Sequence, residues 1–122
     1  MRGSILIVED EPIIRMALAD HLEKQGFEVT EAGSGDRAME LIKETPFDLV
    51  VTDVQMPGWN DGIALALWVR KNHPRTRIII VSGATSGSPE LVALGQEGVV
   101  LPKPYAVEEL ALRAVMLLQE IR

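Results

Sequence analysis

Strand-length apolar runs recur along this chain, separated by segments of a different period. Four of them are nearly unbroken, which is typical of strands buried on both faces of a sheet. They cover Ser4–Val8, 48–52, 77–81 and the shorter 98–101. A fifth run, 27–30, alternates apolar and polar residues, so we predict an edge strand there.

Helical periodicity fills the spaces between these runs. After Pro12, the residues Ile14, Leu18 and Leu22 recur at four-residue spacing, and Gly26 can end that helix in the left-handed conformation. Further helices are predicted over 36–43, 63–71 and 107–121, with Ser34 as a cap and with Ala38, Leu41, Ile42, Leu110, Ala114, Leu117 and Leu118 facing the sheet. Near 91–94, after a run of Gly and Ser, only a short helix is expected. Alternating strands and helices predict an α/β sandwich with a parallel sheet and right-handed crossovers.

Composition narrows the class of protein. The 122 residues, 47% of them hydrophobic, suit a single domain over 1–122 with no output domain. A net charge of -6 and a pI near 4.9 argue against direct binding to nucleic acid. The absence of cysteine excludes disulfides and thiolate zinc sites and is compatible with a cytoplasmic protein. No apolar run is long enough to span a membrane, and no signal peptide is evident.

Polar side chains follow the apolar runs at the points where the predicted strands end. They are the acidic pair Glu9 and Asp10, then Asp53, Ser82 and Lys103. Because the carboxyl ends of parallel strands meet at one edge of a sheet, these side chains are expected in one crevice. Such a set can hold a hard divalent cation, offer a carboxylate to a phosphoryl group and donate hydrogen bonds to phosphoryl oxygens.

The acids Glu9, Asp10 and Glu11 stand in succession and repel one another. A Mg²⁺ ion would relieve that repulsion, with Asp10 and Asp53 as direct ligands and Glu9 acting through water. The alternative is a solvated acidic turn that caps the helix starting at Pro12.

Asp53 directly follows an apolar strand that is expected to end at the edge of the sheet, so we expect its carboxylate to be exposed and orientable. It can attack a phosphoryl donor if a metal and an amine neutralise the charge on the equatorial oxygens. The alternative is a residue that merely opens the turn through 56–58.

Ser82 and Lys103 are candidates for binding the phosphoryl oxygens. Ser82 precedes the small residues Gly83 and Ala84, which leave room for a bulky group, although a turn serine is the plainer interpretation. Lys103 lies between two prolines that restrict its backbone, so its ammonium group can pair with Asp53 and later with the phosphoryl group. The alternative for a lone lysine is a surface position.

Taken together, these residues resemble a known family. Their order along the chain is similar to that in the receiver domain of two-component response regulators, and the resemblance covers essentially the whole chain. Three local strings are similar as well: Val-Glu-Asp-Glu at 8–11, Asp-Val-Gln-Met-Pro-Gly at 53–58 and Lys-Pro-Tyr at 103–105. The resemblance implies a flavodoxin-like (βα)5 three-layer sandwich with a parallel five-stranded sheet of order 2-1-3-4-5. It also implies a cis peptide bond between Lys103 and Pro104.

The resemblance further implies a function. Asp53 would be the phosphoacceptor, supplied by a phosphohistidine on a sensor histidine kinase or a histidine phosphotransfer protein. Mg²⁺ would be held by Asp10, Asp53 and the main-chain carbonyl of Gln55, with Glu9 in support, while Ser82 and Lys103 grip the phosphoryl oxygens. No turnover of a separate substrate is expected. Output would pass to a downstream protein target, with a homodimer possible through the face formed by 89–122.

This chain departs from the family pattern in three places. Val100 stands where the switch aromatic is usual, and Tyr105 is an aromatic at a different position. The loop over 57–62 is one residue longer than common and carries Trp59. The segment 83–88, rich in Gly and Ser, leads to the hypothesis that the output face orders only on phosphorylation.

Other classes of function fit less well. A phosphorylation-independent pseudo-receiver, acting as a protein-interaction module on the same fold, is the main alternative. A flavin site needs a phosphate-cradling loop where this chain is acidic, and a haloacid-dehalogenase-type phosphatase needs an aspartate where Gln55 stands. His21 and His73 are not expected to be phosphohistidines or ligands.

Overall fold

The computed structural model describes residues 2–54, 62–82 and 99–119. Strands and helices alternate along the chain, as the periodicity predicts. The elements are β1 (Ser4–Val8), α1 (Pro12–Lys24), β2 (Glu28–Ala32), α2 (Gly35–Glu44), β3 (Leu49–Asp53), α3 (Gly62–Asn72), β4 (Arg77–Ser82), β5 (Val99–Pro102) and α5 (Val107–Gln119). The predicted bounds of β1 are confirmed, and those of the other strands differ by one or two residues at their ends.

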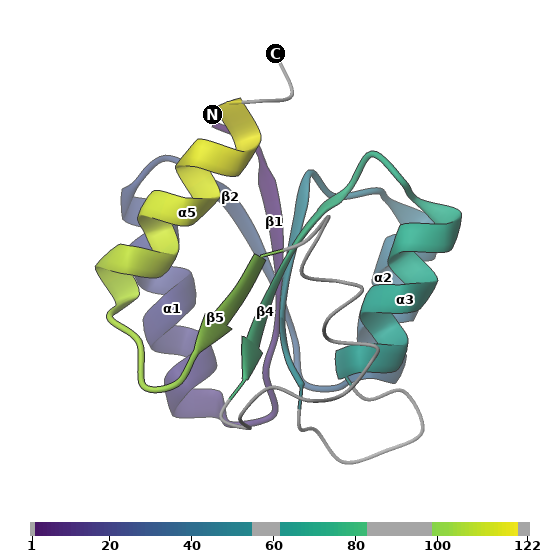
Figure 1. Cartoon of the computed structure of the whole chain (residues 1–122), viewed down its shortest axis with the longest axis horizontal. Helices are drawn as coiled ribbons and strands as arrows, with labels where there is room; N and C mark the ends of the chain where they lie inside the picture. The colour runs from purple at the N-terminus through teal and green to yellow at the C-terminus, as the bar shows by residue number, and fades with distance from the viewer. Residues whose placement is uncertain (1, 55–61, 83–98, 120–122) are drawn as a thin grey trace.

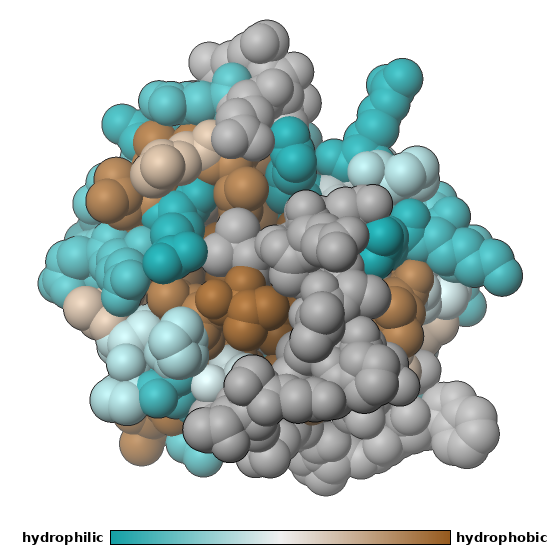
Figure 2. Space-filling model, in the orientation of Figure 1, coloured by the Kyte–Doolittle hydropathy of each residue, from teal (hydrophilic) through white to brown (hydrophobic). Residues whose placement is uncertain are grey.

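The strands form one parallel sheet of order β2-β1-β3-β4-β5, which confirms the predicted topology. In Figure 1, α1 and α5 cover one face of this sheet and α2 and α3 cover the other, so the molecule has three layers. β2 lies at an edge, as its alternating pattern predicts. β5 forms the edge of the sheet opposite to β2. Figure 2 shows apolar side chains gathered in the middle of the face that is turned to the viewer.

Two apolar clusters fill the spaces between the layers. Leu6 and Val8 point into the cluster under α2 and α3, whereas Ile5 and Ile7 point into the cluster under α1 and α5. Successive side chains of a strand face opposite sides of a sheet. A strand buried on both sides must therefore be apolar at every position, which explains the unbroken runs in the sequence.

The helix ends follow local chemistry. Pro12 begins α1, Gly26 adopts a φ of 100° just after it, and the Ser34 side chain accepts a hydrogen bond from the main-chain N–H of Arg37 at the start of α2. Each of these was predicted. Leu41 and Leu117 pack half-buried against the two clusters, as their spacing predicts.

Ile14 corrects the prediction for α1. Its four-residue spacing with Leu18 and Leu22 indicates a common buried stripe, but Ile14 is 38% exposed, whereas the other two are buried. The first turn of α1 faces the segment after β5 instead of the sheet, so Ile14 lies beside Pro104 and Tyr105.

Some predictions lie outside the described residues. They are the short helix near 91–94, the segment 83–88, the loop carrying Trp59, and the last residues of the predicted C-terminal helix. Among the helices that the structure describes, none has the length and apolar character needed to cross a membrane.

Candidate functional site

An ion pair joins Asp53 and Lys103, which are fifty positions apart in the sequence. Asp53 is the last residue of β3, and Lys103 directly follows β5. The Nζ of Lys103 lies 2.6 Å from Oδ2 of Asp53. The peptide bond between Lys103 and Pro104 is cis, as predicted. The structure therefore brings together the carboxylate and the amine that the sequence singles out.

The prediction of an exposed Asp53 is wrong. Its side chain is only 7% exposed, whereas that of Lys103 is 37% exposed. Asp53 still belongs to β3, where it pairs with Val81 of β4, and its backbone is packed under the start of α3. The carboxylate is thus held in place from several sides and does not rotate freely at the edge of the sheet.

Ser82 is the last residue of β4 and is 3% exposed. It pairs with Pro102 in the sheet, and its carbonyl oxygen accepts a hydrogen bond of 2.9 Å from the main-chain N–H of Lys103. Ser82 and Lys103 are therefore tied to each other through the backbone at the same sheet edge as Asp53.

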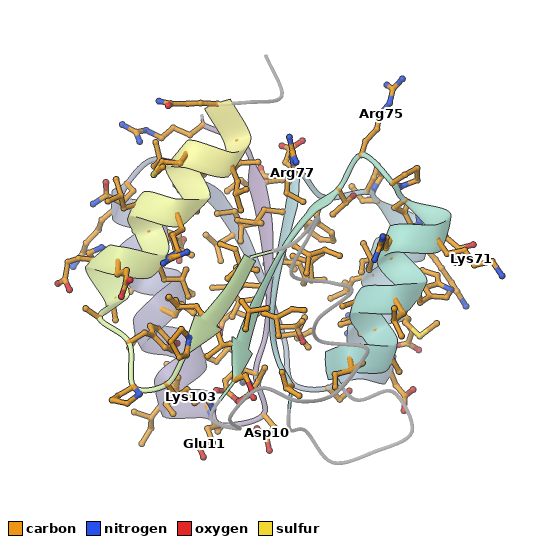
Figure 3. All side chains as sticks on the ribbon, viewed as in Figure 1. Asp10, Glu11, Lys71, Arg75, Arg77 and Lys103 are labelled. Atoms are coloured by element: carbon orange, nitrogen blue, oxygen red, sulfur yellow. The ribbon has the colours of Figure 1, made fainter. Side chains whose placement is uncertain are left out.

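Three acids follow β1 at the same end of the molecule. Figure 3 shows Asp10, Glu11 and Lys103 close together there, whereas Arg75 and Arg77 lie at the opposite end. Glu9 is buried, while Asp10 and Glu11 are exposed. We call residues 9–11 the acidic loop.

At this end of the sheet, burial and neighbouring charges shift the pKa values of Glu9 and Lys103. Burial, an interaction with the Asp10 side chain and the charge of Asp53 raise the pKa of Glu9 to about 7. Burial acts to lower the pKa of Lys103, but its hydrogen bond to Asp53 and the charges of Asp53 and Glu9 outweigh this effect, so that the pKa lies above its ordinary value. A cation is therefore favoured here, and an extra negative charge is not.

The donors for Mg²⁺ are carboxylate oxygens, the ligands that this ion prefers. Within the described ranges, no group of three or more His, Cys, Asp or Glu side chains is placed to hold a metal ion. The predicted set has two direct carboxylates, from Asp10 and Asp53, and a main-chain carbonyl from Gln55, which lies outside the described residues. Burial is the main cause of the raised pKa of Glu9, and Asp10 and the charge of Asp53 add to it; a divalent cation beside these acids would favour their charged forms, so the residues present fit the ion.

An open apolar groove of about 700 Å³ runs along α1 and ends at Lys103. Its walls include Ile13, Ile14 and Ala17 on one side and Pro104, Tyr105 and Val107 on the other. Ile13 is 84% exposed, and together with Ile14 it adds exposed apolar surface to this groove. We refer to this feature, which lies between α1 and the segment that follows β5, as the α1–β5 groove.

Gly62 is a site residue that the sequence reasoning missed. It begins α3, and a Cβ at this position would overlap the carbonyl oxygen and carbon of Asp53 and crowd the Cα of Val54. Its main-chain N–H donates a hydrogen bond to the carbonyl oxygen of Val54. A usable signal was present, because glycine is a poor helix former and stands where the helical pattern begins.

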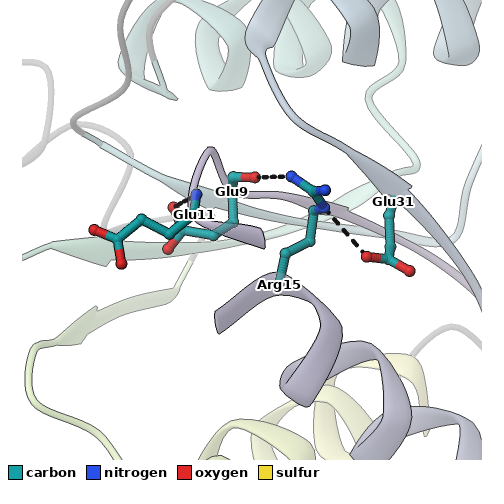
Figure 4. A network of polar contacts seen from close by, with 4 residues as sticks. All are labelled: Glu9, Glu11, Arg15 and Glu31. Atoms are coloured by element: carbon teal, nitrogen blue, oxygen red, sulfur yellow. Dashed lines mark hydrogen bonds and ion pairs between the residues drawn. The ribbon is translucent and has the colours of Figure 1, made fainter. Parts of the chain in front are cut away.

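Arg15 was also missed. It contacts the backbone of the acidic loop and a carboxylate on β2, as Figure 4 shows. The signal in the sequence was a cation close to the N-terminus of a helix, where the helix dipole disfavours positive charge.

The remaining predictions have mixed outcomes. Val100, at the position of the usual switch aromatic, is half-buried and packs against the cluster under α2 and α3. Val115 packs against the other cluster, whereas Met116, the next residue, is 57% exposed. His73 packs against Trp68 with ring centroids 5.4 Å apart, and His21 is half-buried on α1.

Comparison with known proteins gives one consistent family. The sequence model of the response regulator receiver domain matches residues 5–115. Over 113 residues the chain is 39% identical to the sensor kinase CckA of Brucella abortus, covering 89% of this chain and 12% of that protein. It is 35% identical to the transcriptional regulatory protein SrrA of Staphylococcus aureus, covering 98% of this chain and 49% of that protein.

A solved structure agrees with the sequence matches. The receiver domain of the Francisella response regulator 1452 has a TM-score of 0.87 and 29% identity, covering 98% of this chain and 99% of that one. The chain spans less than half the length of the two curated relatives named above. With the parallel sheet, the strand-end residues and these matches in agreement, the chain belongs to the response regulator receiver domain family of two-component systems.

Proposed function

We propose that this domain accepts a phosphoryl group on Asp53 from a phosphohistidine. The single observation that supports this most strongly is the 2.6 Å ion pair between Lys103 and a carboxylate whose side chain is 7% exposed. A buried carboxylate at a strand end is held ready for attack, and the ammonium beside it can compensate the charge that gathers on the phosphoryl oxygens.

In this reaction an oxygen of the Asp53 carboxylate attacks the phosphorus atom, and the P–N bond to the donor histidine breaks. The bonding electron pair stays on the imidazole nitrogen. The product is an acyl phosphate, and Lys103 then pairs with a phosphoryl oxygen while the Ser82 hydroxyl donates to another. No turnover of a separate substrate belongs to this proposal.

The ion in this proposal is Mg²⁺, held by Asp10, Asp53 and the main-chain carbonyl of Gln55, with Glu9 in support through water. When bound, it would neutralise negative charge on the carboxylates and on the incoming phosphoryl group. The raised pKa of Glu9 supports this assignment, because burial first, and then Asp10 and the charge of Asp53, disfavour its charged form, which a bound cation would favour.

The donor in this proposal is a sensor histidine kinase or a histidine phosphotransfer protein, docked in the α1–β5 groove. The groove is apolar along α1 and reaches the site at Lys103, so a helix lying in it can bring its histidine to Asp53. The exposed Ile13 would be covered by such a partner.

The output side of the proposal rests on the sequence. A downstream protein target and a homodimer through the face formed by 89–122 remain predictions, and the parts 89–98 and 120–122 of that face lie outside the described residues. Leu112 and Met116 of α5 are 59% and 57% exposed, which leaves apolar surface on this face for a protein contact. The cytoplasmic location is part of the same proposal.

Intact mass spectrometry tests the proposed reaction. The protein is incubated with acetyl phosphate and Mg²⁺, and in parallel with the metal removed by a chelator. We expect one phosphoryl adduct that hydroxylamine removes, that needs Mg²⁺ and that is absent from Asp53→Asn. Asp20→Asn is the matched control, because Asp20 pairs with Lys24 on the surface of α1 and lies outside the site.

The opposite outcome is equally clear. If neither acetyl phosphate nor a phosphohistidine protein yields an adduct on the wild-type chain, the phosphoacceptor proposal fails. The pseudo-receiver alternative would then account for the fold, and binding of a partner without phosphorylation would become the function to measure.

A further inference from the structure

Arg15 links three elements near the candidate site. Its Nη1 donates a hydrogen bond of 2.9 Å to the main-chain oxygen of Glu9, and its Nε lies 3.2 Å from Oε1 of Glu31 on β2. The Arg15 side chain is 21% exposed, and that of Glu31 is 38% exposed. Figure 4 shows the guanidinium group between the two glutamates, with both contacts drawn.

The contact with Glu9 completes the anchoring of its main chain. The N–H of Glu9 donates a hydrogen bond of 3.1 Å to the carbonyl oxygen of Ala32, the last residue of β2. Its carbonyl oxygen accepts from Arg15, which is in turn held by Glu31, the neighbour of Ala32. Both polar main-chain atoms of Glu9 are thus connected to the end of β2, one directly and one through Arg15.

The position of Arg15 gives the helix itself little benefit. It lies close to the N-terminus of α1, where the first turn contains no acidic residue and where Glu11 makes no side-chain cap. A cation there opposes the helix dipole. The planar guanidinium can bind a carbonyl and a carboxylate at the same time in fixed directions, whereas a lysine ammonium is a point charge on a flexible stem. The two contacts therefore require an arginine.

We propose that Arg15 is a positioning residue, one that fixes the acidic loop to β2 and so holds Glu9 and Asp10 at the end of the sheet where Asp53 lies, before any cation binds. The consequence of this inference rests on the proposed function: the ligands for Mg²⁺ are pre-organised before the ion binds. It does not require Arg15 to touch the ion or the phosphoryl group. Mutation of a residue that orients a metal ligand from outside the site commonly lowers the affinity for the metal by about tenfold or more.

Binding of Mg²⁺ alone, measured by titration calorimetry, tests the consequence. We expect Arg15→Lys to weaken binding by about tenfold, because it keeps the positive charge but loses the two-point contact. Glu31→Gln keeps Arg15 and removes its ion pair, so we expect a smaller loss, about threefold. The matched controls are Arg37→Lys, in a surface ion pair on α2, and Glu28→Gln, at the other end of β2. Both should bind as the wild type does.

Amide hydrogen exchange on the metal-free protein provides a readout that is independent of metal and phosphoryl chemistry. We expect residues 9–11 to exchange at least about threefold faster in Arg15→Lys and in Glu31→Gln, because their backbone loses its link to β2. The amides of β3 and β4 should be unchanged. If Arg15→Lys does not fold, Glu31→Gln decides the question alone.

The outcomes separate this inference from the proposed function. If the wild type binds no Mg²⁺ and gains no phosphoryl group, the proposed function fails, and the exchange data still decide whether Arg15 fixes the acidic loop. Wild-type exchange and wild-type Mg²⁺ affinity in Arg15→Lys would overturn the inference. So would an equal loss of affinity in Glu28→Gln and Glu31→Gln, because that result would reflect general charge and not position.

Discussion

Gly62 at the start of α3 lies against the main chain of Asp53, so close that any side chain on Gly62 would overlap the Asp53 carbonyl. The same carbonyl oxygen accepts a hydrogen bond of 3.1 Å from the hydroxyl of Thr52. The main chain of Gly62 therefore packs directly against the main chain at the end of β3, and only a residue without a side chain permits so close an approach. The position of the phosphoacceptor candidate depends on this contact.

Gly62→Ala should move the start of α3 or the end of β3. We expect a loss of about 1–3 kcal/mol in the free energy of unfolding, because the new methyl group meets backbone that cannot yield. Gly33→Ala is the comparison, since its Cβ would meet no backbone and would lie 3.3 Å from Nη1 of Arg15, so we expect a smaller loss there. Urea unfolding measures both variants. Equal stabilities for the two would contradict the close approach of Gly62 to Asp53.

Lys103→Met should leave the buried Asp53 carboxylate without its cation. Because Lys103 is 37% exposed, we expect a loss of only about 1 kcal/mol at pH 7. The folded-state pKa of Lys103 is raised, so its contribution is fully present below the unfolded value of about 10.4 and is lost as the pH rises through the folded pKa. Urea unfolding at pH 7 and above pH 10.4 checks this, with Lys24→Met, from an exposed ion pair, as a nearly neutral control. A pH-independent difference would argue against the pair.

In the metal-free protein, the contribution of Glu9 to the free energy of unfolding should fall as the pH rises from about 4.3 to about 7. Glu9 has a folded pKa of about 7, above its unfolded value of about 4.3, so between these values the folded state binds the extra proton. The loss can reach about 3 kcal/mol. Unfolding by urea in chelator across this pH range measures it. Glu9→Gln should flatten the profile, whereas Glu11→Gln, the exposed neighbour, should not.

Tyr105 offers a spectroscopic measure of the charge at the site, because it is the one tyrosine in the chain. Burial and then the charge of Glu9 raise its pKa, while Lys103 acts in the opposite direction. Absorbance of tyrosinate should therefore appear with a midpoint above about 10, while circular dichroism shows that the chain is folded. In Glu9→Gln the midpoint should fall, because one of the charges that oppose ionisation is gone. A midpoint unaffected by Glu9→Gln would place Tyr105 out of reach of the acids.

The α1–β5 groove should matter for a protein donor and not for a small one. Ile13→Ser removes exposed apolar surface from the groove, so transfer from a phosphohistidine protein should slow by about tenfold, a loss of one apolar anchor. Phosphorylation by acetyl phosphate should keep its wild-type rate. Met16→Ser is the control, because Met16 is 60% exposed on the same helix but does not line the groove. Equal slowing by both variants would point to another docking surface.

Much of the fold follows from short-range patterns. The unbroken apolar run of β1 predicts a strand buried on both faces, and the alternation in β2 predicts an edge; both are confirmed. Helix ends were predictable where a single residue carries the local chemistry, as at Pro12 and Ser34. Strand ends were predicted less well, because the last polar residue of a strand, such as Asp53, resembles the first residue of a loop.

The sequence by itself determined the alternation of strands and helices, the parallel sheet and the polar residues at its carboxyl edge, because side-chain period and turn chemistry act over a few residues. Only the tertiary structure decided that Asp53 is buried, that Gly62 must be a glycine and that Arg15 ties the acidic loop to β2. Each of these depends on the distance between segments that are far apart in the chain. That distance is set by the packing of whole layers against one another, which no local pattern encodes.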